Sequence, residues 1–132
     1  MQPLINALGD RDEHVRTYAA SALAFFDDER AIKPLIRLLS DTSPGVRSAA
    51  VMGLKREEDP RIVEALIRML SDSDETVRHR AVNSLGLSKD PRAVKPLIGR
   101  LSDQEDRVRE GAANALGKLK AVVAVPQLLV LL

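Results

Sequence analysis

Cysteine is absent from the 132 residues of this chain. A disulfide framework, a thiolate metal site and a cysteine nucleophile are therefore excluded, and the absence fits a reducing compartment. Tryptophan is also absent, and aromatic residues make up only 2% of the sequence. No run reaches the roughly 18 apolar residues of a membrane span, and the first residues lack the features of a secretory signal. We therefore expect a cytoplasmic protein.

Charge of one sign is also lacking. The chain has 20 Lys and Arg against 19 Asp and Glu, which gives a formal net charge of +1. Without a bulk basic field, electrostatic attraction to nucleic acid or to an anionic membrane is disfavoured. The composition is otherwise that of an ordered chain, since 45% of the residues are hydrophobic and 30% are charged.

The sequence repeats with a period of 31 residues. The dipeptide Val-Arg recurs at this spacing, at Val15-Arg16, Val46-Arg47, Val77-Arg78 and Val108-Arg109. An aspartate stands six residues before each arginine, at positions 10, 41, 72 and 103. We therefore expect one domain over 1–132, with repeats at about 3–33, 34–64, 65–95 and 96–126 and a partial fifth repeat at 127–132.

Each repeat contains two helical stripes. In the second repeat, the apolar residues of the first helix (helix A) are Ile32, Leu35, Ile36 and Leu39, and those of the second helix (helix B) are Val46, Ala50, Val51 and Leu54. This spacing of three and four residues is typical of amphipathic helices, and no alternation typical of strands is present. A single helix pair cannot bury its own stripe, whereas stacked pairs can. The predicted fold is all-α, an α-solenoid (superhelix) of stacked antiparallel helix pairs.

Proline marks the expected helix ends and bends. Asp59-Pro60, Asp90-Pro91 and Ser43-Pro44 each place a capping side chain before a proline at the first helical position. Two further prolines, Pro34 and Pro96, fall about six residues inside helix A. Because an interior proline removes a backbone hydrogen bond, we expect these A helices to be kinked.

The motif Asp-Pro-Arg-Ala-Val-Lys-Pro-Leu-Ile at 90–98, followed by Val-Arg and Ala-Leu-Gly in the next helix, resembles the HEAT-like repeats of the phycobilin-lyase (PBS lyase) type. The resemblance covers essentially the whole chain. It implies an armadillo-like superhelix whose B helices form a concave, partner-binding face. It also implies a structural role for the repeated Asp and Arg, which we expect to join neighbouring repeats through bidentate hydrogen bonds.

The positions of helix B that differ between repeats lie three or four residues apart, on one face. Aromatic residues, Met and Arg on such a face are enriched at contact surfaces. The competing interpretation is drift at unconstrained surface positions. We predict that this face binds a protein or peptide through His14, Tyr18, Ser21, Phe25, Met52, Arg56, His79, Arg80, Asn83, Leu87, Arg107, Asn114 and Lys118.

Catalysis is not expected. The glycines are scattered singly, which disfavours a phosphate-binding loop. Some HEAT-like proteins are di-iron hydroxylases with His-Glu pairs, but the two histidines here stand in Glu13-His14 and His79-Arg80. We predict a non-catalytic scaffold with no catalytic, metal-binding or cofactor-binding residues.

Two alternatives stay open. The resemblance to bilin lyases suggests a lyase-like subunit that acts on phycobiliproteins. A nucleic-acid-binding HEAT-like solenoid is the third reading, because Arg56, Arg80, Arg107 and Lys118 are basic. Acidic residues stand beside these cations, and a face that tracks phosphates should be unmixed, so nucleic acid is disfavoured as a partner.

The segment 121–132 aligns with helix A but carries no charge. One reading is that the chain is a fragment of a longer array. The other, which we predict, is self-association through this apolar segment.

Overall fold

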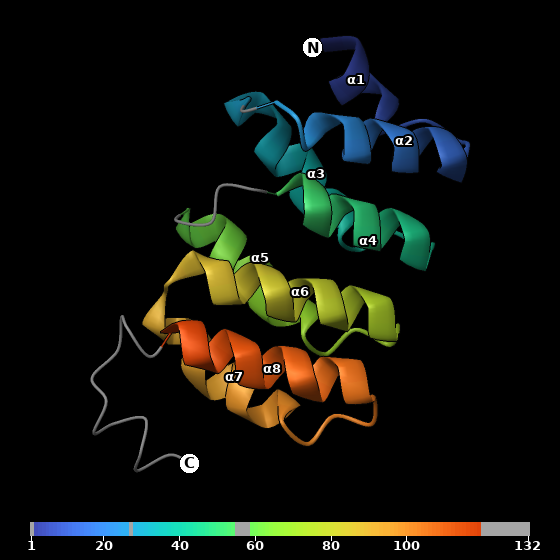
Figure 1. The fold of residues 1–132 in the computed structure, drawn as a ribbon. Helices are drawn as coiled ribbons and strands as arrows, with labels where there is room; N and C mark the ends of the chain where they lie inside the picture. The colour runs from blue at the N-terminus through green and yellow to red at the C-terminus, as the bar shows by residue number, and fades with distance from the viewer. Residues whose placement is uncertain (1, 27, 55–58, 120–132) are drawn as a thin grey trace. The chain divides into compact units, whose positions relative to one another are not determined.

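The computed structural model describes residues 2–26, 28–54 and 59–119 (Figure 1). Within these ranges all regular secondary structure is helical. The elements are α1 (Gln2–Ala7), α2 (Glu13–Leu23), the 3-10 helix η1 (Glu29–Ala31), α3 (Ile32–Leu38), α4 (Pro44–Gly53), α5 (Pro60–Met69), α6 (Glu75–Ser88), the 3-10 helix η2 (Pro91–Ala93), α7 (Val94–Arg100) and α8 (Asp106–Leu119). The segment 121–132, with its predicted self-association, lies outside the described residues.

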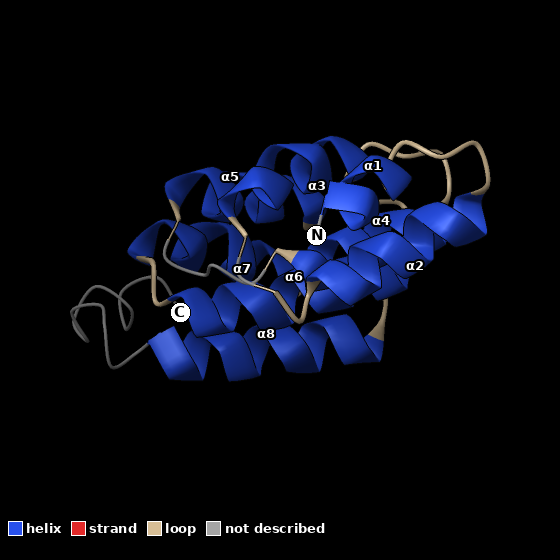
Figure 2. Ribbon diagram, turned by 90° about the horizontal axis from the view of Figure 1, so that it is seen from above, coloured by secondary structure: helices blue, strands red, loops and turns tan. Residues whose placement is uncertain are grey.

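The chain divides into two compact units, residues 1–56 and 57–132. In the first unit, α1 packs on α2, α3 packs on α4, and the two B helices α2 and α4 lie side by side (Figures 1 and 2). Leu23 and Leu35, which come from helices B and A of successive repeats, are almost fully buried. Paired helices therefore share one apolar core in this unit, as the 31-residue period predicts.

The second unit repeats the arrangement. α5 packs on α6, α7 packs on α8, and the B helices α6 and α8 lie side by side. Leu66, Leu85 and Leu97 are fully buried. They occupy the same repeat positions as the core leucines of the first unit, so the same sequence columns build both cores. Each predicted repeat boundary (33/34, 64/65 and 95/96) falls inside an A helix, so the helix pairs are offset from the sequence repeats by several residues.

The expected kink at the inner prolines is wrong, because the A helices that contain them are divided instead of bent. Pro34 and Pro96 each occupy the third residue of a short α-helix, α3 or α7, and a 3-10 turn precedes each of these helices. The third helical N–H has no intrahelical partner in any case, so the proline removes no bond there. Where Ala65 replaces the proline, α5 is one continuous helix from Pro60 to Met69. Proline therefore divides helix A into two short helices.

Aspartate side chains cap five of the ten described helices. Those of Asp12, Asp59 and Asp74 accept a hydrogen bond from a backbone N–H two residues later, and Asp28 and Asp90 do the same for the 3-10 helices. Ser43 stands at the predicted cap of α4 in an extended conformation, but its side chain makes no capping hydrogen bond. The predicted capping role of Ser43 is therefore wrong, although its position before Pro44 is correct.

The repeated Asp and Arg join neighbouring repeats, as predicted. In the first unit, Arg16 donates from Nε and Nη2 to the two carboxylate oxygens of Asp41 at 2.9 and 3.1 Å. Burial opposes ionisation of Asp41, but hydrogen bonds from Arg16 and from the Ser43 backbone N–H outweigh it and lower the pKa of the carboxyl. The repeated Asp and Arg residues therefore have a structural role within each unit.

Among the described residues, no helix has the length and apolar character needed to cross a membrane.

Candidate functional site

The structure places the predicted face on the B helices. In the first unit, α2 carries His14, Tyr18 and Ser21, the turn after α2 carries Phe25, and α4 carries Met52. In the second unit, α6 and α8 carry the remaining described positions, which are His79, Arg80, Asn83, Leu87, Arg107, Asn114 and Lys118. None of these side chains is buried, although Ser21, His79 and Arg80 are partly covered. Arg56 lies outside the described residues. Two groups therefore form, one on each unit.

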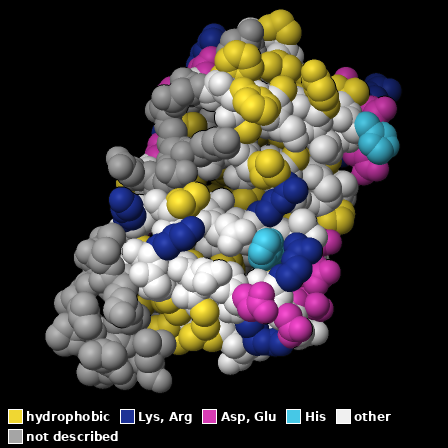
Figure 3. Space-filling view, viewed as in Figure 1, with side chains coloured by type: hydrophobic (Ala, Val, Ile, Leu, Met, Phe, Trp, Pro, Cys, Tyr) yellow, Lys and Arg dark blue, Asp and Glu magenta, His cyan; other side chains and the backbone are white. Residues whose placement is uncertain are grey.

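The first group, the aromatic patch, consists of Tyr18, Phe25, Phe26 and Met52. Their exposed fractions are 72%, 86%, 53% and 42% respectively. The chain has one tyrosine, two phenylalanines and no tryptophan, so all of its aromatic side chains lie in this patch. Figure 3 shows apolar side chains gathered over α2. An exposed aromatic cluster on packed helices is typical of a binding surface.

Phe26 is the member of the patch that sequence reasoning missed. The 31-residue period aligns Phe26 with Ser88 and Leu119, and both of these are buried in the second unit. By that alignment, Phe26 belongs in the core. The structure instead leaves Phe26 more than half exposed, and Val15 is 37% exposed where the aligned Val77 is fully buried. The available signal was the pair of adjacent phenylalanines, which extends the patch beyond the one helix face that we considered.

The second group, the α6–α8 seam, consists of His79, Asn83, Arg107, Gly111, Asn114 and Lys118. Nη2 of Arg107 lies 3.5 Å from Nδ1 of His79, and Nδ2 of Asn83 lies 3.5 Å from Nε2 of the same ring. Both distances are at the limit of a hydrogen bond. The imidazole ring therefore stands between an amide from its own helix and a guanidinium from α8.

Two glycines let α6 and α8 approach closely at the seam. A Cβ on Gly111 would lie 3.2 Å from Cγ1 of Val82 and 3.4 Å from Oδ1 of Asn83. A Cβ on Gly86 would lie 2.9 Å from both Cα and Cβ of Ala115. Because these glycines have no side chain, the two helices pack closely enough for their polar residues to reach each other.

Electrostatics keep the seam imidazole neutral. Burial is the main cause that lowers the pKa of His79 below its ordinary value of 6.5, and the positive charges of Arg107 and Arg80 lower this pKa further. A neutral ring accepts a hydrogen bond at one nitrogen and carries its N–H at the other, so it can accept from Arg107 at Nδ1 or from Asn83 at Nε2. The positive charge of the seam therefore rests on Arg107 and Lys118.

Two carboxylates lie at the N-terminal end of these helices, where Glu75 begins α6 and Glu105 immediately precedes α8. Glu105 lies beside Glu75, and the hydrogen bond between their side chains raises the pKa of Glu105. Over the described part of the chain, no group of three His, Cys, Asp or Glu is arranged to hold a metal ion.

Comparisons with known proteins agree with the repeat fold. The sequence model of HEAT repeats matches residues 1–75 and 63–132. Among curated proteins, none matches the chain. The structure is similar to the complex of CpcE and CpcF of phycocyanin lyase from Nostoc sp. PCC7120, with a TM-score of 0.81 and 27% identity over 95% of this chain and 55% of the other.

Two further structures share the fold at lower identity. One is human deoxyhypusine hydroxylase in complex with glycerol, with a TM-score of 0.75 and 24% identity over 92% of this chain and 43% of that one. The other is a designed armadillo repeat protein in complex with the peptide (KR)4, with a TM-score of 0.70 and 24% identity over 89% of this chain and 63% of that one. The chain thus spans less than two thirds of each of the three structures.

These neighbours confirm the predicted α-solenoid class, and the likeness to phycocyanin lyase supports the resemblance to the phycobilin-lyase type of repeat. Since the two matched ranges together cover the whole sequence, the chain belongs to the family of HEAT-repeat proteins.

Proposed function

We propose that this protein is a non-catalytic scaffold that binds a protein or peptide segment through its B helices. The exposure of every aromatic side chain of the chain on one short segment, residues 18–26, carries the proposal. Apolar side chains of this size stabilise a fold by about 1.5–3 kcal/mol each when they are buried. Held exposed beside a closed aliphatic core, they offer that free energy to a partner instead.

The way the patch is held also supports the proposal. The backbone N–H of Phe25 donates to the carbonyl of Ala22, and that of Phe26 donates to the carbonyl of Leu23. The turn that carries both rings is therefore anchored to the last turn of α2. Anchors that are ordered before binding lose less conformational entropy when a partner docks.

The solved structures are consistent with this use of the fold. The designed armadillo repeat protein was solved with a bound peptide. In the family that the sequence resembles, the B helices form the concave, partner-binding face. We propose the same face here, with the aromatic patch as the main anchor, because a few aromatic residues supply most of the binding free energy at protein interfaces.

Capture of partners from the native lysate tests the proposal. The wild-type protein and the double variant Tyr18→Ala/Phe25→Ala are immobilised, and the captured proteins are compared by mass spectrometry. We expect at least one protein to be retained by the wild type and lost by the variant, while circular dichroism shows that the variant stays folded. The double variant Tyr18→Ala/Arg80→Ala, which combines one residue from each unit, should lose the same protein.

The matched control is Lys33→Ala/Lys95→Ala, which removes two exposed side chains from the A helices α3 and α7. This variant should retain the partner. If the patch variant and the control retain the same proteins as the wild type, the B-helix face is not the binding surface.

A lyase-like role in attaching or detaching bilins is the second candidate, and the likeness to the CpcE and CpcF complex favours it. Mixing the purified protein with a bilin tests this role by absorption spectroscopy. A shifted absorption band supports a bilin-related activity, and an unchanged spectrum removes it.

A further inference from the structure

The B-helix positions of the second unit differ in charge from those of the first. On α6 and α8 the variable positions carry three cations, Arg80, Arg107 and Lys118, against one carboxylate, Glu110. The described variable positions of α2 and α4 carry no Lys, Arg, Asp or Glu. Figure 3 shows the corresponding contrast between apolar side chains over α2 and basic side chains over α6 and α8.

In the described part of the chain, two of the three cations have no carboxylate partner. Most arginines of the described ranges contact an aspartate, as Arg78 contacts Asp103 and Arg92 contacts Asp90. Arg107 and Lys118, by contrast, form no ion pair with a carboxylate among the described residues. The contact of Arg107 is the neutral imidazole of His79, at 3.5 Å. Its guanidinium therefore keeps most of its donors available to a ligand.

The seam places these groups in two adjacent rows. On α8, Arg107, Asn114 and Lys118 follow one another at intervals of seven and four residues, which keeps them on one side of the helix. On α6, His79 and Asn83 form the facing row. Gly111 stands between Arg107 and Asn114 in the α8 row, where it faces His79 and Asn83 and has no side chain to separate the two rows. A carboxylate above Gly111 would meet a guanidinium on one side and the ring and amide on the other.

An acidic peptide fits this seam better than a nucleic acid does. Glu110 stands three residues after Arg107 and would repel a continuous line of phosphates. Single-stranded nucleic acids also rely on aromatic stacking, and all three aromatic residues of the chain lie at 18–26, in the first unit. Separate carboxylates can instead pair with individual cations and avoid Glu110.

We propose that the α6–α8 seam binds an acidic segment of the partner protein, with one of its carboxylates held by Arg107 beside His79 and a second one held by Lys118. This inference rests on the proposed function, because it specifies the chemistry of the partner that the B helices hold. It adds that the part of the partner on the second unit is rich in Glu or Asp.

Fluorescence anisotropy with labelled peptides tests the inference. The probes are an extended Glu-Ser-Gly peptide, the same peptide with Gln in place of Glu, one with Lys in place of Glu, and a single-stranded DNA oligonucleotide. We expect the Glu peptide to bind about tenfold more tightly than the Gln peptide. Equal affinity for the Glu and Gln peptides, or tighter binding of the DNA than of the Glu peptide, would overturn the inference.

A charge-matched pair of variants assigns the binding to the seam. Arg107→Ala removes a cation from the seam, and Lys95→Ala removes one from the A helix α7. We expect Arg107→Ala to weaken Glu-peptide binding about tenfold and Lys95→Ala to leave it within about twofold of the wild type. Equal losses would mean that net charge alone attracts the peptide, and the inference would be wrong.

The two proposals fail in different ways. If the lysate partner is lost on Tyr18→Ala/Phe25→Ala but the Glu peptide does not bind, the scaffold function stands and the acidic segment is wrong. If Tyr18→Ala/Phe25→Ala retains all captured proteins while the Glu peptide binds and responds to Arg107→Ala, the aromatic anchor is wrong and the seam stands.

Discussion

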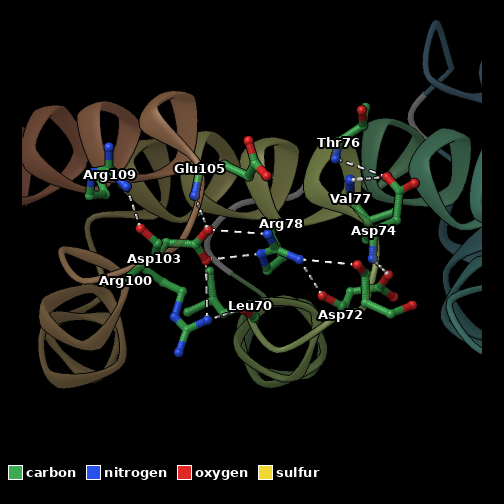
Figure 4. Close-up of polar contacts among 11 residues, drawn as sticks. Leu70, Asp72, Asp74, Thr76, Val77, Arg78, Arg100, Asp103, Glu105 and Arg109 are labelled. Atoms are coloured by element: carbon green, nitrogen blue, oxygen red, sulfur yellow. Dashed lines mark hydrogen bonds and ion pairs between the residues drawn. The ribbon is translucent and has the colours of Figure 1, made fainter.

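Arg78 donates from Nε and Nη2 to the two carboxylate oxygens of Asp103, twenty-five residues further along the chain, at 2.9 and 3.1 Å. Both residues are buried. The remaining nitrogen of Arg78, Nη1, donates to the carbonyls of Asp72 and Ser73 in the turn before α6 (Figure 4). Asp103 also accepts a hydrogen bond from Arg100. One arginine thus closes the turn of its own repeat and holds the turn of the next.

Removing either member of this pair should destabilise the second unit strongly. Arg78→Ala leaves Asp103 buried without its main counter-charge, and we expect the free energy of unfolding to fall by about 3 kcal/mol. Asp103→Ala should cost a similar amount. The double variant should cost less than the sum, because no unpaired charge then stays buried. Urea unfolding followed by circular dichroism measures all three.

Arg109 provides the control for the pair. It occupies the same repeat position, and its carboxylate partner, Asp106, is exposed. We expect Arg109→Ala to cost about 1 kcal/mol or less. If Arg109→Ala and Arg78→Ala cost the same, burial of the ion pair is not the source of its stabilising effect.

Gly86 and Gly117 are exactly one repeat apart and offer a second matched comparison. A Cβ on Gly86 would lie 2.9 Å from the backbone of Ala115, whereas nothing described lies within 4 Å of a Cβ on Gly117. We expect Gly86→Ala to destabilise the protein by about 1–3 kcal/mol through overpacking. Gly117→Ala should instead stabilise it by up to about 1 kcal/mol, because alanine is the better helix former. Thermal unfolding of the two variants should shift the midpoint in opposite directions.

The helical repeat was predictable from sequence because its determinants are local. The 31-residue period and the apolar spacing of positions such as Leu35 and Val46 specify helices and their buried sides directly. The Asp and Arg columns could also be assigned to structure, since one copy per repeat is what contacts between neighbouring repeats require. The division of helix A at Pro34 and Pro96 was not predicted, because the count of residues from the expected cap did not show where the α-helix itself begins.

The candidate site was less predictable. Period and face identified Tyr18, Phe25 and Met52 as exposed, and the structure agrees. The 31-residue period wrongly predicts burial for Phe26. Alignment by the period assumes that equivalent positions have the same environment in every repeat, but the environment of this position differs between repeats. The contact between His79 and Arg107 depends on the close approach at Gly111, and no local sequence signal reports how closely two helices pack.

Stability should depend on the protonation of His79. Its pKa in the folded protein is lowered by burial and by the charges of Arg107 on α8 and Arg80 on its own helix. The unfolded chain, with a histidine pKa near 6.5, therefore binds the proton at a higher pH than the folded one does. The stabilising contribution is complete above pH 6.5 and is lost as the pH falls below that value.

Proton NMR of the His79 ring measures this shift directly. We expect an inflection below pH 6.5 in the wild type and one closer to 6.5 in Arg107→Gln, where one of the two neighbouring charges is gone. In His79→Asn the corresponding loss of stability between pH 7 and pH 5 should be reduced. An inflection above 6.5 in the wild type would contradict the contact with Arg107.

Exchange of proline and alanine between A helices tests how α3 is divided. In Pro34→Ala, residues 29–38 should form one continuous helix capped by Asp28, as α5 does behind Asp59. Amide hydrogen exchange at residues 31–33 should then slow relative to the wild type, because a continuous α-helical hydrogen-bond pattern protects this turn. The reverse change, Ala65→Pro, should divide α5 into a 3-10 turn and a shorter helix. Its cost should stay below the roughly 3 kcal/mol of a proline in a helix interior, since this fold already accommodates the divided form twice. If Ala65→Pro costs the full penalty of about 3 kcal/mol for an interior proline, and Pro34→Ala gains no protection from exchange, then the proline is not what divides the helix.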